Sequence, residues 1–181
     1  MALPDESNCI QNSLAGDHEA YATLVKEYQK MVYAVAFRMT GSLDAAEDLT
    51  QETFLRAYRQ LESFRSESKF STWLCRIAIN LSLTWRDRER RRDTIHTQWA
   101  EEAIVDAHDA GTSPNDLSRR VQGALDKLPA KQRAAIVLTV YENRSHAEAA
   151  KVLGCTEATV SWRVFAARQK LKRLLKGVSH E

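Results

Sequence analysis

The chain has 181 residues, 44% of them hydrophobic, and a formal net charge of only +2. This apolar content is too high for a disordered protein, and no apolar run approaches the about 18 residues that span a bilayer. The three cysteines form no Cys-x-x-Cys pair, so a zinc site built on cysteine pairs is not expected. We interpret Cys75 and Cys155 as small core residues and Cys9 as an exposed free thiol.

Residues 1–14 are polar and are predicted to form a flexible N-terminus. They lack the order of charged, apolar and small residues that marks a signal peptide. We therefore expect the protein to be cytoplasmic.

Three amphipathic helices are predicted within residues 15–92. Apolar residues recur at helical spacing over residues 20–39, and Gly41 and Ser42 are suited to end that helix and to begin the next. The second helix is expected to run to about Phe64, and the polar segment 65–72 is expected to form a loop. A third helix follows and continues into a run of arginines that ends at position 92. A shared apolar seam would join the three helices into a small bundle.

Charge is distributed unevenly along the chain. Residues 1–92 carry 13 cations and 13 acids, residues 93–117 carry six acids and no cation, and residues 118–181 carry 13 cations and five acids. The acidic stretch also contains Gly111 and Pro114, which interrupt regular structure. We interpret 93–117 as a flexible acidic linker, with a short helical turn at 99–105, between a neutral domain and a basic one.

Residues 118–176 are predicted to form a second helical domain, followed by a short tail over 177–181. Pro129 suits the first turn of a helix whose core positions are Ile136, Val137, Val140 and Tyr141. No strand pattern is longer than a few residues. The predicted fold class is therefore all-α, with two small helical domains joined by the linker.

The end of the second domain has the pattern of a helix-turn-helix. Ser145 and Glu148 match a capping box, Gly154 lies in a short turn, and Thr156 can cap the last helix. Apolar residues then recur every three or four positions, at Val160, Val164, Ala167 and Leu171. A lone basic helix would most simply be a solvated surface helix. The preceding helix and turn instead favour a helix that reads DNA.

Three segments in this order carry a resemblance to a known family. They are AEDLTQETFLRAYRQLESF (46–64), FSTWLCRIAINLSLTWRDRERR (70–91) and LDKLPAKQRAAIVL (125–138), and the helix-turn-helix follows them. With these motifs the chain resembles the bacterial sigma-70 factors of the extracytoplasmic-function (ECF) group. The resemblance implies a region 2 domain, a region 4 domain and a factor that binds core RNA polymerase, finds the minus-10 and minus-35 elements of promoter DNA and helps to melt it. An anti-sigma factor, often membrane-tethered, is a further implied partner.

The resemblance places the polymerase-binding surface at the polar start of the second helix, on Asp44, Glu47, Asp48, Gln51 and Glu52. An acidic patch suits a basic partner, although a solvated helix face would explain the same residues. The resemblance also implies that the linker threads through the polymerase. Its negative charge could mimic nucleic acid in a basic channel, which is a hypothesis.

The resemblance places minus-10 recognition on the loop and on the third helix, at Phe64, Ser68, Lys69, Phe70, Asn80, Trp85, Arg86 and Arg88. Asn80 could hydrogen-bond a flipped base, or it could be an ordinary helix asparagine. Trp73 is interpreted as a core residue, whereas packing and base stacking both stay open for Trp85. The arginines of the third helix would lie along the DNA phosphates, or they would only balance the partial negative charge at the C-terminal end of that helix.

The resemblance places minus-35 recognition on the last helix, at Thr159, Ser161, Trp162, Arg163, Phe165 and Arg168. Arginine pairs with guanine, and serine or threonine can bond to base edges or phosphate. Asn143 stands where the family usually has glycine, and Ser161-Trp162 stand where basic and small residues are common. Trp162 could contact a thymine methyl group or pack against another surface, so the minus-35 sequence cannot be transferred from relatives.

Two other function classes fit the sequence less well. The histidines form no HExxH pattern, and neither a glycine-rich phosphate loop nor a Ser/His/Asp arrangement stands out. We therefore expect no enzymatic activity, metal or cofactor. The alternative function is a stand-alone helix-turn-helix regulator, which would bind a duplex operator unaided, whereas a sigma factor binds core polymerase first.

Overall fold

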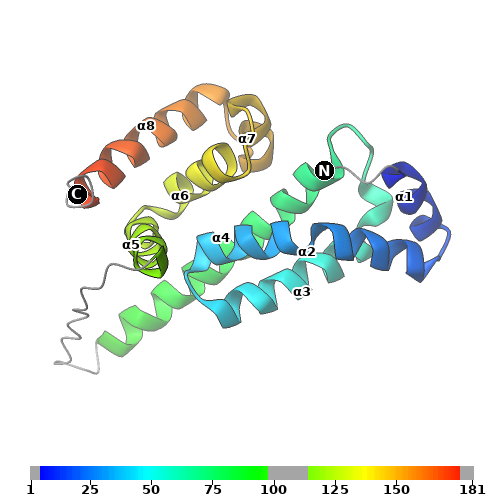
Figure 1. Cartoon of the computed structure of the whole chain (residues 1–181), viewed down its shortest axis with the longest axis horizontal. Coiled ribbons are helices and arrows are strands. Elements are labelled where there is room, and N and C mark those ends of the chain that lie inside the picture. Colours follow the sequence, from blue (N-terminus) through cyan, green and yellow to red (C-terminus); the bar gives the residue numbers. More distant parts are fainter. Residues whose placement is uncertain (1–4, 98–113, 176–181) are drawn as a thin grey trace.

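The computed structural model describes residues 5–97 and 114–175, which form helices joined by turns (Figure 1). In chain order these are α1 (Glu6–Leu14), α2 (His18–Thr40), α3 (Leu43–Arg59), the 3-10 turn η1 (Leu61–Ser63), α4 (Phe70–Thr97), α5 (Pro114–Asp126), α6 (Ala130–Ile136), the π-helical turn η2 (Val137–Tyr141), α7 (His146–Leu153) and α8 (Glu157–Leu174). No strand occurs within these two ranges, in agreement with the all-α prediction. None of the helices there is both long and apolar enough to cross a membrane.

The front half is a bundle of α2, α3 and α4, with α1 packed against α2. The Asp17 carboxylate caps the N-terminus of α2 by accepting hydrogen bonds from the backbone N–H groups of Glu19 and Ala20. Gly41 ends α2 in the left-handed conformation, with φ +77°, and the Ser42 hydroxyl accepts a bond from the N–H of Ala45 at 3.2 Å. Both predicted cap positions are thereby confirmed.

The N-terminal segment differs from the flexible stretch predicted over residues 1–14. Residues 6–14 form α1, in which Ile10 is buried and the Ser13 hydroxyl donates to the carbonyl oxygen of Cys9 at 2.6 Å. The polar composition concealed this helix because it buries a narrow stripe on a single face. Residues 1–4 lie outside the described residues.

Element boundaries also differ from the predictions. α3 ends at Arg59 rather than near Phe64, because the chain tightens into η1. α4 begins at Phe70, inside the predicted loop, and runs to Thr97, beyond the predicted domain boundary at residue 92. The centre of the predicted linker, with the turn expected at 99–105, lies outside the described residues.

The C-terminal half consists of α5 to α8. Ile136 and Val137 are buried as predicted, but α6 then passes into the π-helical turn η2. Because a π-helical turn contains more residues than an α-helical turn, the residues that follow point in different directions around the helix axis. Val140 is consequently 46% exposed and Tyr141 is half-buried, so the prediction of core positions there is wrong for Val140 and only partly right for Tyr141.

The three cysteines are free thiols. Cys75 is buried as predicted, and burial raises the pKa of its thiol to about 12. Cys155 is half-buried in the turn before α8, where Nη1 of Arg163 lies 3.4 Å from its Sγ atom. Cys9 is also half-buried, which corrects the expectation of an exposed thiol.

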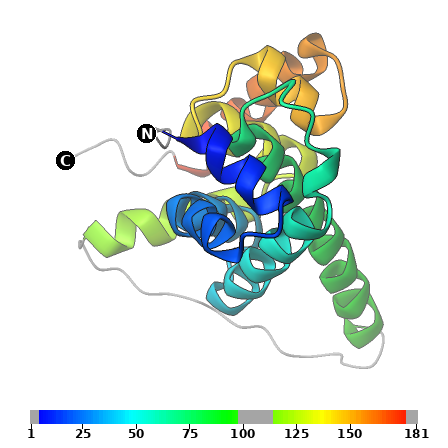
Figure 2. The ribbon, with the colours of Figure 1, turned by 90° about the vertical axis from the view of Figure 1, so that its right-hand side faces the viewer.

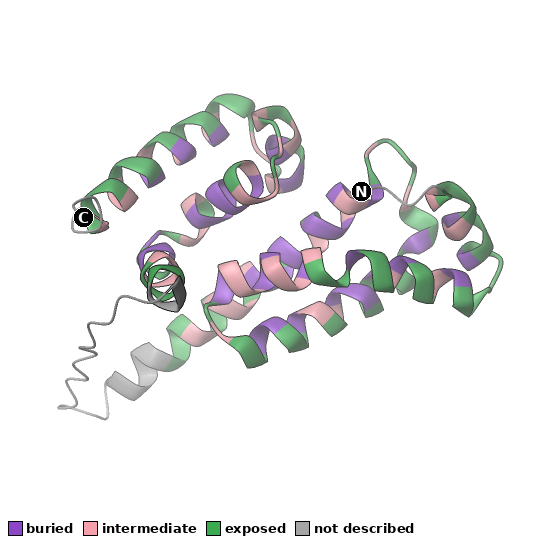
Figure 3. Ribbon diagram, viewed as in Figure 1, coloured by how far each residue is buried: buried purple, intermediate pink, exposed green. Residues whose placement is uncertain are grey.

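The two halves pack against each other: α5 and α6 contact α2, and α6 and α7 contact α4 (Figures 1 and 2). One continuous apolar cluster contains buried residues of both halves, and the buried faces of α2, α4 and α6 turn toward this shared interior (Figure 3). Arg133 of α6 lies completely buried within the contact. Its Nη1 atom donates to the carbonyl oxygen of Met39 at 2.8 Å and to Oδ1 of Asp126 at 2.7 Å.

Charged groups also join the two halves around this contact. Nη1 of Arg38 lies 3.9 Å from Oε1 of Glu142, and its guanidinium stands 4.3 Å from the centre of the Tyr141 ring. Burial raises the pKa of Glu142, and the positive charges of Arg38 and Arg144 only partly offset that rise. The junction is therefore a packed interface with buried polar groups.

Candidate functional site

The predicted polymerase-binding residues lie on the first half of α3. Asp44, Glu47, Asp48 and Gln51 are exposed. Glu52 is half-buried and accepts a hydrogen bond from Nε of Arg56 at 2.6 Å. The fold thus presents four of the five side chains to solvent, and the fifth is held in a pair within its own helix.

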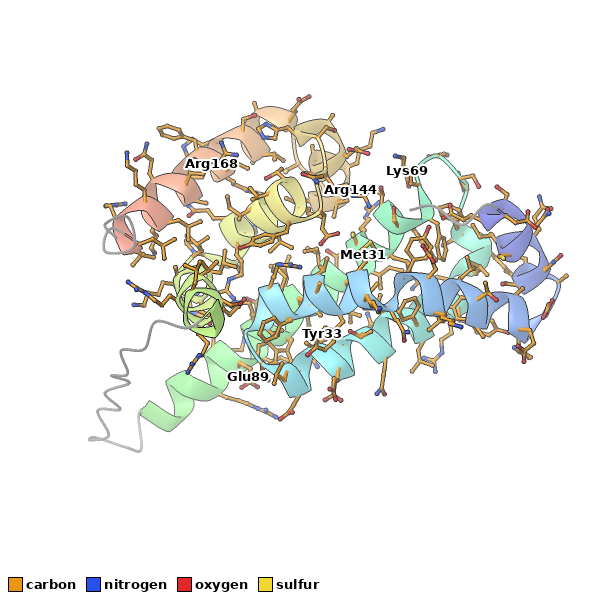
Figure 4. All side chains as sticks on the ribbon, in the orientation of Figure 1. Met31, Tyr33, Lys69, Glu89, Arg144 and Arg168 are labelled. Atoms are coloured by element: carbon orange, nitrogen blue, oxygen red, sulfur yellow. The ribbon has the colours of Figure 1, made fainter. Side chains whose placement is uncertain are left out.

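Two hollows between α2 and α3 border this acidic patch. The smaller, of about 400 Å³, is lined by Gln29, Lys30, Tyr33, Glu47, Thr50 and Gln51, with Tyr33 projecting between the helices (Figure 4). The larger, of about 630 Å³, is more apolar and is lined by Tyr21, Val25, Phe54, Leu55 and Tyr58 among others. Sequence reasoning missed the larger hollow, although the exposed apolar pair Leu55 and Tyr58, three residues apart on α3, was a usable signal.

The loop predicted to take up the minus-10 element is held by an aromatic cluster. The ring centres of Phe64 and Phe70 are 5.4 Å apart, and that of Trp73 lies 5.3 Å from Phe64 and 5.5 Å from Phe70. Phe70 is completely buried and offers no surface to DNA in this structure, so its direct contact with DNA stays a prediction. Trp73 is half-buried and packs against the hydrophobic core, in agreement with its prediction as a core residue. Lys69 is exposed and Ser68 half-buried at the tip.

The predicted DNA-contacting residues of α4 divide into exposed and engaged side chains. Asn80 and Arg88 are exposed. Trp85 is half-buried against a small cluster between α2, α3 and α4, which favours packing over an open stacking platform. Nη1 of Arg86 donates to the carbonyl oxygen of Met39 at 3.0 Å, and burial lowers its pKa. Arg86 therefore has a partner at the junction of the two halves in this structure, and its contact with phosphate stays a prediction.

A hollow of about 440 Å³ lies where the loop meets the C-terminal half. It is lined by Glu6, Glu27, Tyr28, Met31, Lys69, Ser71 and Arg144. Arg144 enters it from the segment between η2 and α7, and its Nη2 atom donates to the Ser71 hydroxyl at 2.8 Å. Figure 4 shows Arg144, Lys69 and Met31 near one another at this junction. Sequence reasoning had no means of finding Arg144, because the contact joins residues 73 positions apart.

The helix-turn-helix is built by the predicted local interactions. The Ser145 hydroxyl accepts a bond from the N–H of Glu148, whose carboxylate accepts one from the N–H of Ser145 at 2.9 Å, so the capping box is confirmed. These bonds lower the pKa of Glu148. Gly154 ends α7 with φ +59°, and the Thr156 hydroxyl caps α8 through the N–H of Thr159.

The predicted minus-35 residues occupy the outer side of α8. Val160, Val164 and Ala167 face the core as predicted, whereas Leu171 is only half-buried. Four of the predicted residues are exposed, namely Ser161, Trp162, Phe165 and Arg168, and Arg168 projects freely in Figure 4. Thr159 and Arg163 are half-buried. The surface offered to a ligand is thus both cationic and aromatic.

Comparisons with known proteins agree with this architecture. The family description Sigma-70 region 2 matches residues 24–92, and Sigma-70 region 4 matches residues 118–171. The chain is 34% identical to the ECF RNA polymerase sigma factor SigW of Bacillus subtilis (strain 168), over 92% of this chain and 95% of that protein. It is 35% identical to the ECF RNA polymerase sigma-E factor of Haemophilus influenzae, over 90% of this chain and 91% of that protein.

Solved structures with the same architecture include two complexes. The sigma factor RpoE in complex with the anti-sigma factor NepR, from Bartonella quintana, has a TM-score of 0.69 and 31% identity, covering 86% of this chain and 96% of that one. CnrH in complex with the cytosolic domain of CnrY has a TM-score of 0.70 and 30% identity, covering 96% of this chain and 99% of that one. Taken with the two family matches in their order along the sequence, these similarities assign the protein: the chain belongs to the ECF sigma factors of the sigma-70 family.

Proposed function

We propose that this ECF sigma factor binds core RNA polymerase through the acidic start of α3 and directs it to promoters through two DNA-reading surfaces. The loop 63–72 and the exposed side of α4 would take the minus-10 element, and the outer side of α8 would take the minus-35 element. The single observation that carries the proposal is the arrangement of two exposed surfaces of opposite charge. An acidic patch lies on the region 2 module, and a cationic recognition helix lies on the region 4 module.

The two surfaces suit different partners. Asp44, Glu47 and Asp48 form an anionic patch that a basic protein surface would complement, and DNA would be repelled by it. Residues 145–175 contain six cations and two acids, which suits phosphate and gives salt-dependent affinity. We propose a division into region 2 at 15–92, linker at 93–117 and region 4 at 118–176, with α1 packed against region 2 and the ends of α4 and α5 reaching into the linker range.

Run-off transcription with purified core polymerase on a library of promoter sequences tests the proposal. The expected result is selective initiation that requires the chain, with two enriched elements upstream of the start sites. Initiation that is equally efficient on all sequences, or that does not need the chain, would contradict the proposal.

A charge reversal isolates the polymerase contact. Glu47→Lys is expected to weaken co-purification with core polymerase at low salt, because it places a cation in the anionic patch. Glu19→Lys is the matched control, since it reverses an exposed acid near the start of α2. Equal loss of binding in both variants would point to a general charge effect and would refute the assignment of the patch.

The rival function, a stand-alone helix-turn-helix regulator, predicts different binding. Such a protein would saturate a palindromic duplex without polymerase. A mobility-shift titration with and without core polymerase separates the two functions. We expect promoter binding by the chain alone to be weak and to become strong in the holoenzyme.

We also propose an anti-sigma factor as a regulatory partner, supported by the two structural relatives that are sigma factors in complex with anti-sigma factors. The proposed site of action is the cytoplasm, where core polymerase and promoter DNA are found. No catalytic activity of the chain itself is proposed, and its role in initiation is to bind and position.

A further inference from the structure

Two large aromatic side chains on α8 are exposed to solvent. Trp162 and Phe165 are each 63% exposed, and their spacing of three residues places them on one side of the helix. The opposite side is anchored by Val160, Val164 and Ala167, which are buried. The pair is therefore held outward on a helix that cannot rotate to bury it without exposing its own core residues.

The polar side chains around the pair already have partners within the protein. The Ser161 hydroxyl donates to the carbonyl oxygen of Glu157 at 3.1 Å and lies 2.8 Å from Nδ1 of His146. The hydroxyl of Thr159 lies 2.8 Å from that of Thr156, and Nη1 of Arg163 lies 3.4 Å from the sulfur of Cys155. In the first half of α8, the two aromatic rings are therefore the large apolar groups that reach outward.

The charge around the pair indicates what approaches it. Residues 145–175 carry six cations and two acids, and Arg168, Lys172 and Arg173 are exposed farther along α8. An apolar contact inside a cationic surface suits a polyanion that also presents an apolar group. In the major groove of DNA that group is the C5-methyl of thymine, since the other base-edge groups there are hydrogen-bond donors and acceptors.

We propose that Trp162, with Phe165 beside it, determines promoter specificity by packing against thymine C5-methyl groups in the upstream promoter element. This inference rests on the proposed function, because it requires that α8 enters the major groove of that element. It adds that this sigma factor reads at least one upstream position by apolar contact and not by an arginine–guanine pair.

Deoxyuridine substitution tests the proposal without altering the protein. Each thymine of the upstream element, on either strand, is replaced by deoxyuridine, which removes only the methyl group, and holoenzyme binding is measured by competition. Burying one methyl group supports an effect of about threefold to fivefold. We expect such a loss at one or two positions with the wild-type chain, and no loss at those positions with Trp162→Ala.

Two variants and a promoter selection separate loss of the thymine contact from loss of folding. Trp162→Ala is expected to keep the wild-type melting temperature, because the side chain is exposed, and to lose affinity for the thymine promoter. Leu174→Ala removes another exposed apolar side chain from the same helix, 39% exposed, and should retain the full deoxyuridine effect. A promoter selection with Trp162→Ala should lose its preference for thymine at the affected positions.

Three outcomes would overturn the inference. They are the absence of a deoxyuridine effect at every upstream thymine, an equal effect in wild type and Trp162→Ala, and unchanged promoter affinity of Trp162→Ala with weakened binding to an anti-sigma factor. The last would make the aromatic pair a protein-docking surface. Failure of the proposed function is distinguishable, because the wild-type holoenzyme would then show no dependence on any upstream element.

Discussion

Removing the carboxylate of Asp126 is expected to destabilise the protein more than replacing its buried partner Arg133 by methionine. Arg133 is completely buried, whereas the Asp126 side chain is 42% exposed. Nε and Nη2 of Arg133 are buried and have no hydrogen-bond partner among the described residues. Burial, followed by repulsion from Arg86, lowers the pKa of Arg133 to about 10, although Asp126 acts against the shift.

The expected magnitudes follow from these contacts. A hydrogen bond to a charged group contributes about 1.5–3 kcal/mol, and the exposure of Asp126 places Asp126→Ala near the low end, at about 1–2 kcal/mol. Arg133→Met loses the bonds to Asp126 and to the Met39 carbonyl, but it also removes two buried donors whose lack of partners costs about 1–3 kcal/mol each. The Met39 oxygen keeps its bond from Arg86 at 3.0 Å. The net change for Arg133→Met is therefore expected to lie within about 1 kcal/mol of zero.

Urea titration followed by circular dichroism measures both variants, with the midpoint and the slope compared against wild type. Glu62→Ala is the control, because it removes an exposed acid of η1, which packs against α1 and α3 of the front half. A loss of about 3 kcal/mol or more for Arg133→Met, or no loss for Asp126→Ala, would refute the reasoning. Either result would mean that the buried guanidinium is better satisfied than its contacts indicate.

Three further predictions concern the core, the helix-turn-helix and pH. Phe70→Ala should destabilise the protein by about 3–5 kcal/mol in the same titration, whereas Asn80→Ala, at an exposed position of the same helix, should change it by less than about 0.5 kcal/mol. Ser145→Ala should cost about 1 kcal/mol and weaken promoter binding. It should only reduce the stability that Glu148 contributes above its ordinary pKa, which wild type loses as pH falls through the lowered pKa, because the backbone N–H of residue 145 still donates to the Glu148 carboxylate. Because burial raises the pKa of Glu142 on folding, stability should fall as pH rises from the ordinary glutamate pKa through the raised one. Glu142→Gln should show a smaller fall over that range, and identical pH profiles of the two proteins would contradict this.

Local structure was largely predictable because its causes lie within a few residues. The caps at Ser42, Ser145 and Thr156 are hydrogen bonds to N–H groups three residues away, and all were correctly predicted. The left-handed ends at Gly41 and Gly154 are equally local. The periodic apolar residues of α2 and α8 face the core because helical spacing already places them on one side.

The contacts of two predicted site residues could not be foreseen, because they form where distant segments meet. Arg86 was expected along phosphate, but it bonds to the carbonyl oxygen of Met39, 47 residues away. Phe70 was expected at DNA, but it fills the space between Tyr28, Phe64 and Trp73. A basic or aromatic residue has the same appearance in the sequence whether it faces solvent or a neighbouring helix, so composition could not distinguish these cases.

Residue spacing and motifs in a fixed order were enough to predict the helical character, the order of the two modules, the caps and the family. Contacts between distant segments, which no such pattern predicts, pack the modules together and join α1 to the front bundle. They also bring Arg133 and Arg86 to the same Met39 carbonyl oxygen. The contact between Arg133 and Met39 spans 94 residues. Its formation depends on surfaces that exist only after both bundles have folded, and no local pattern encodes their match.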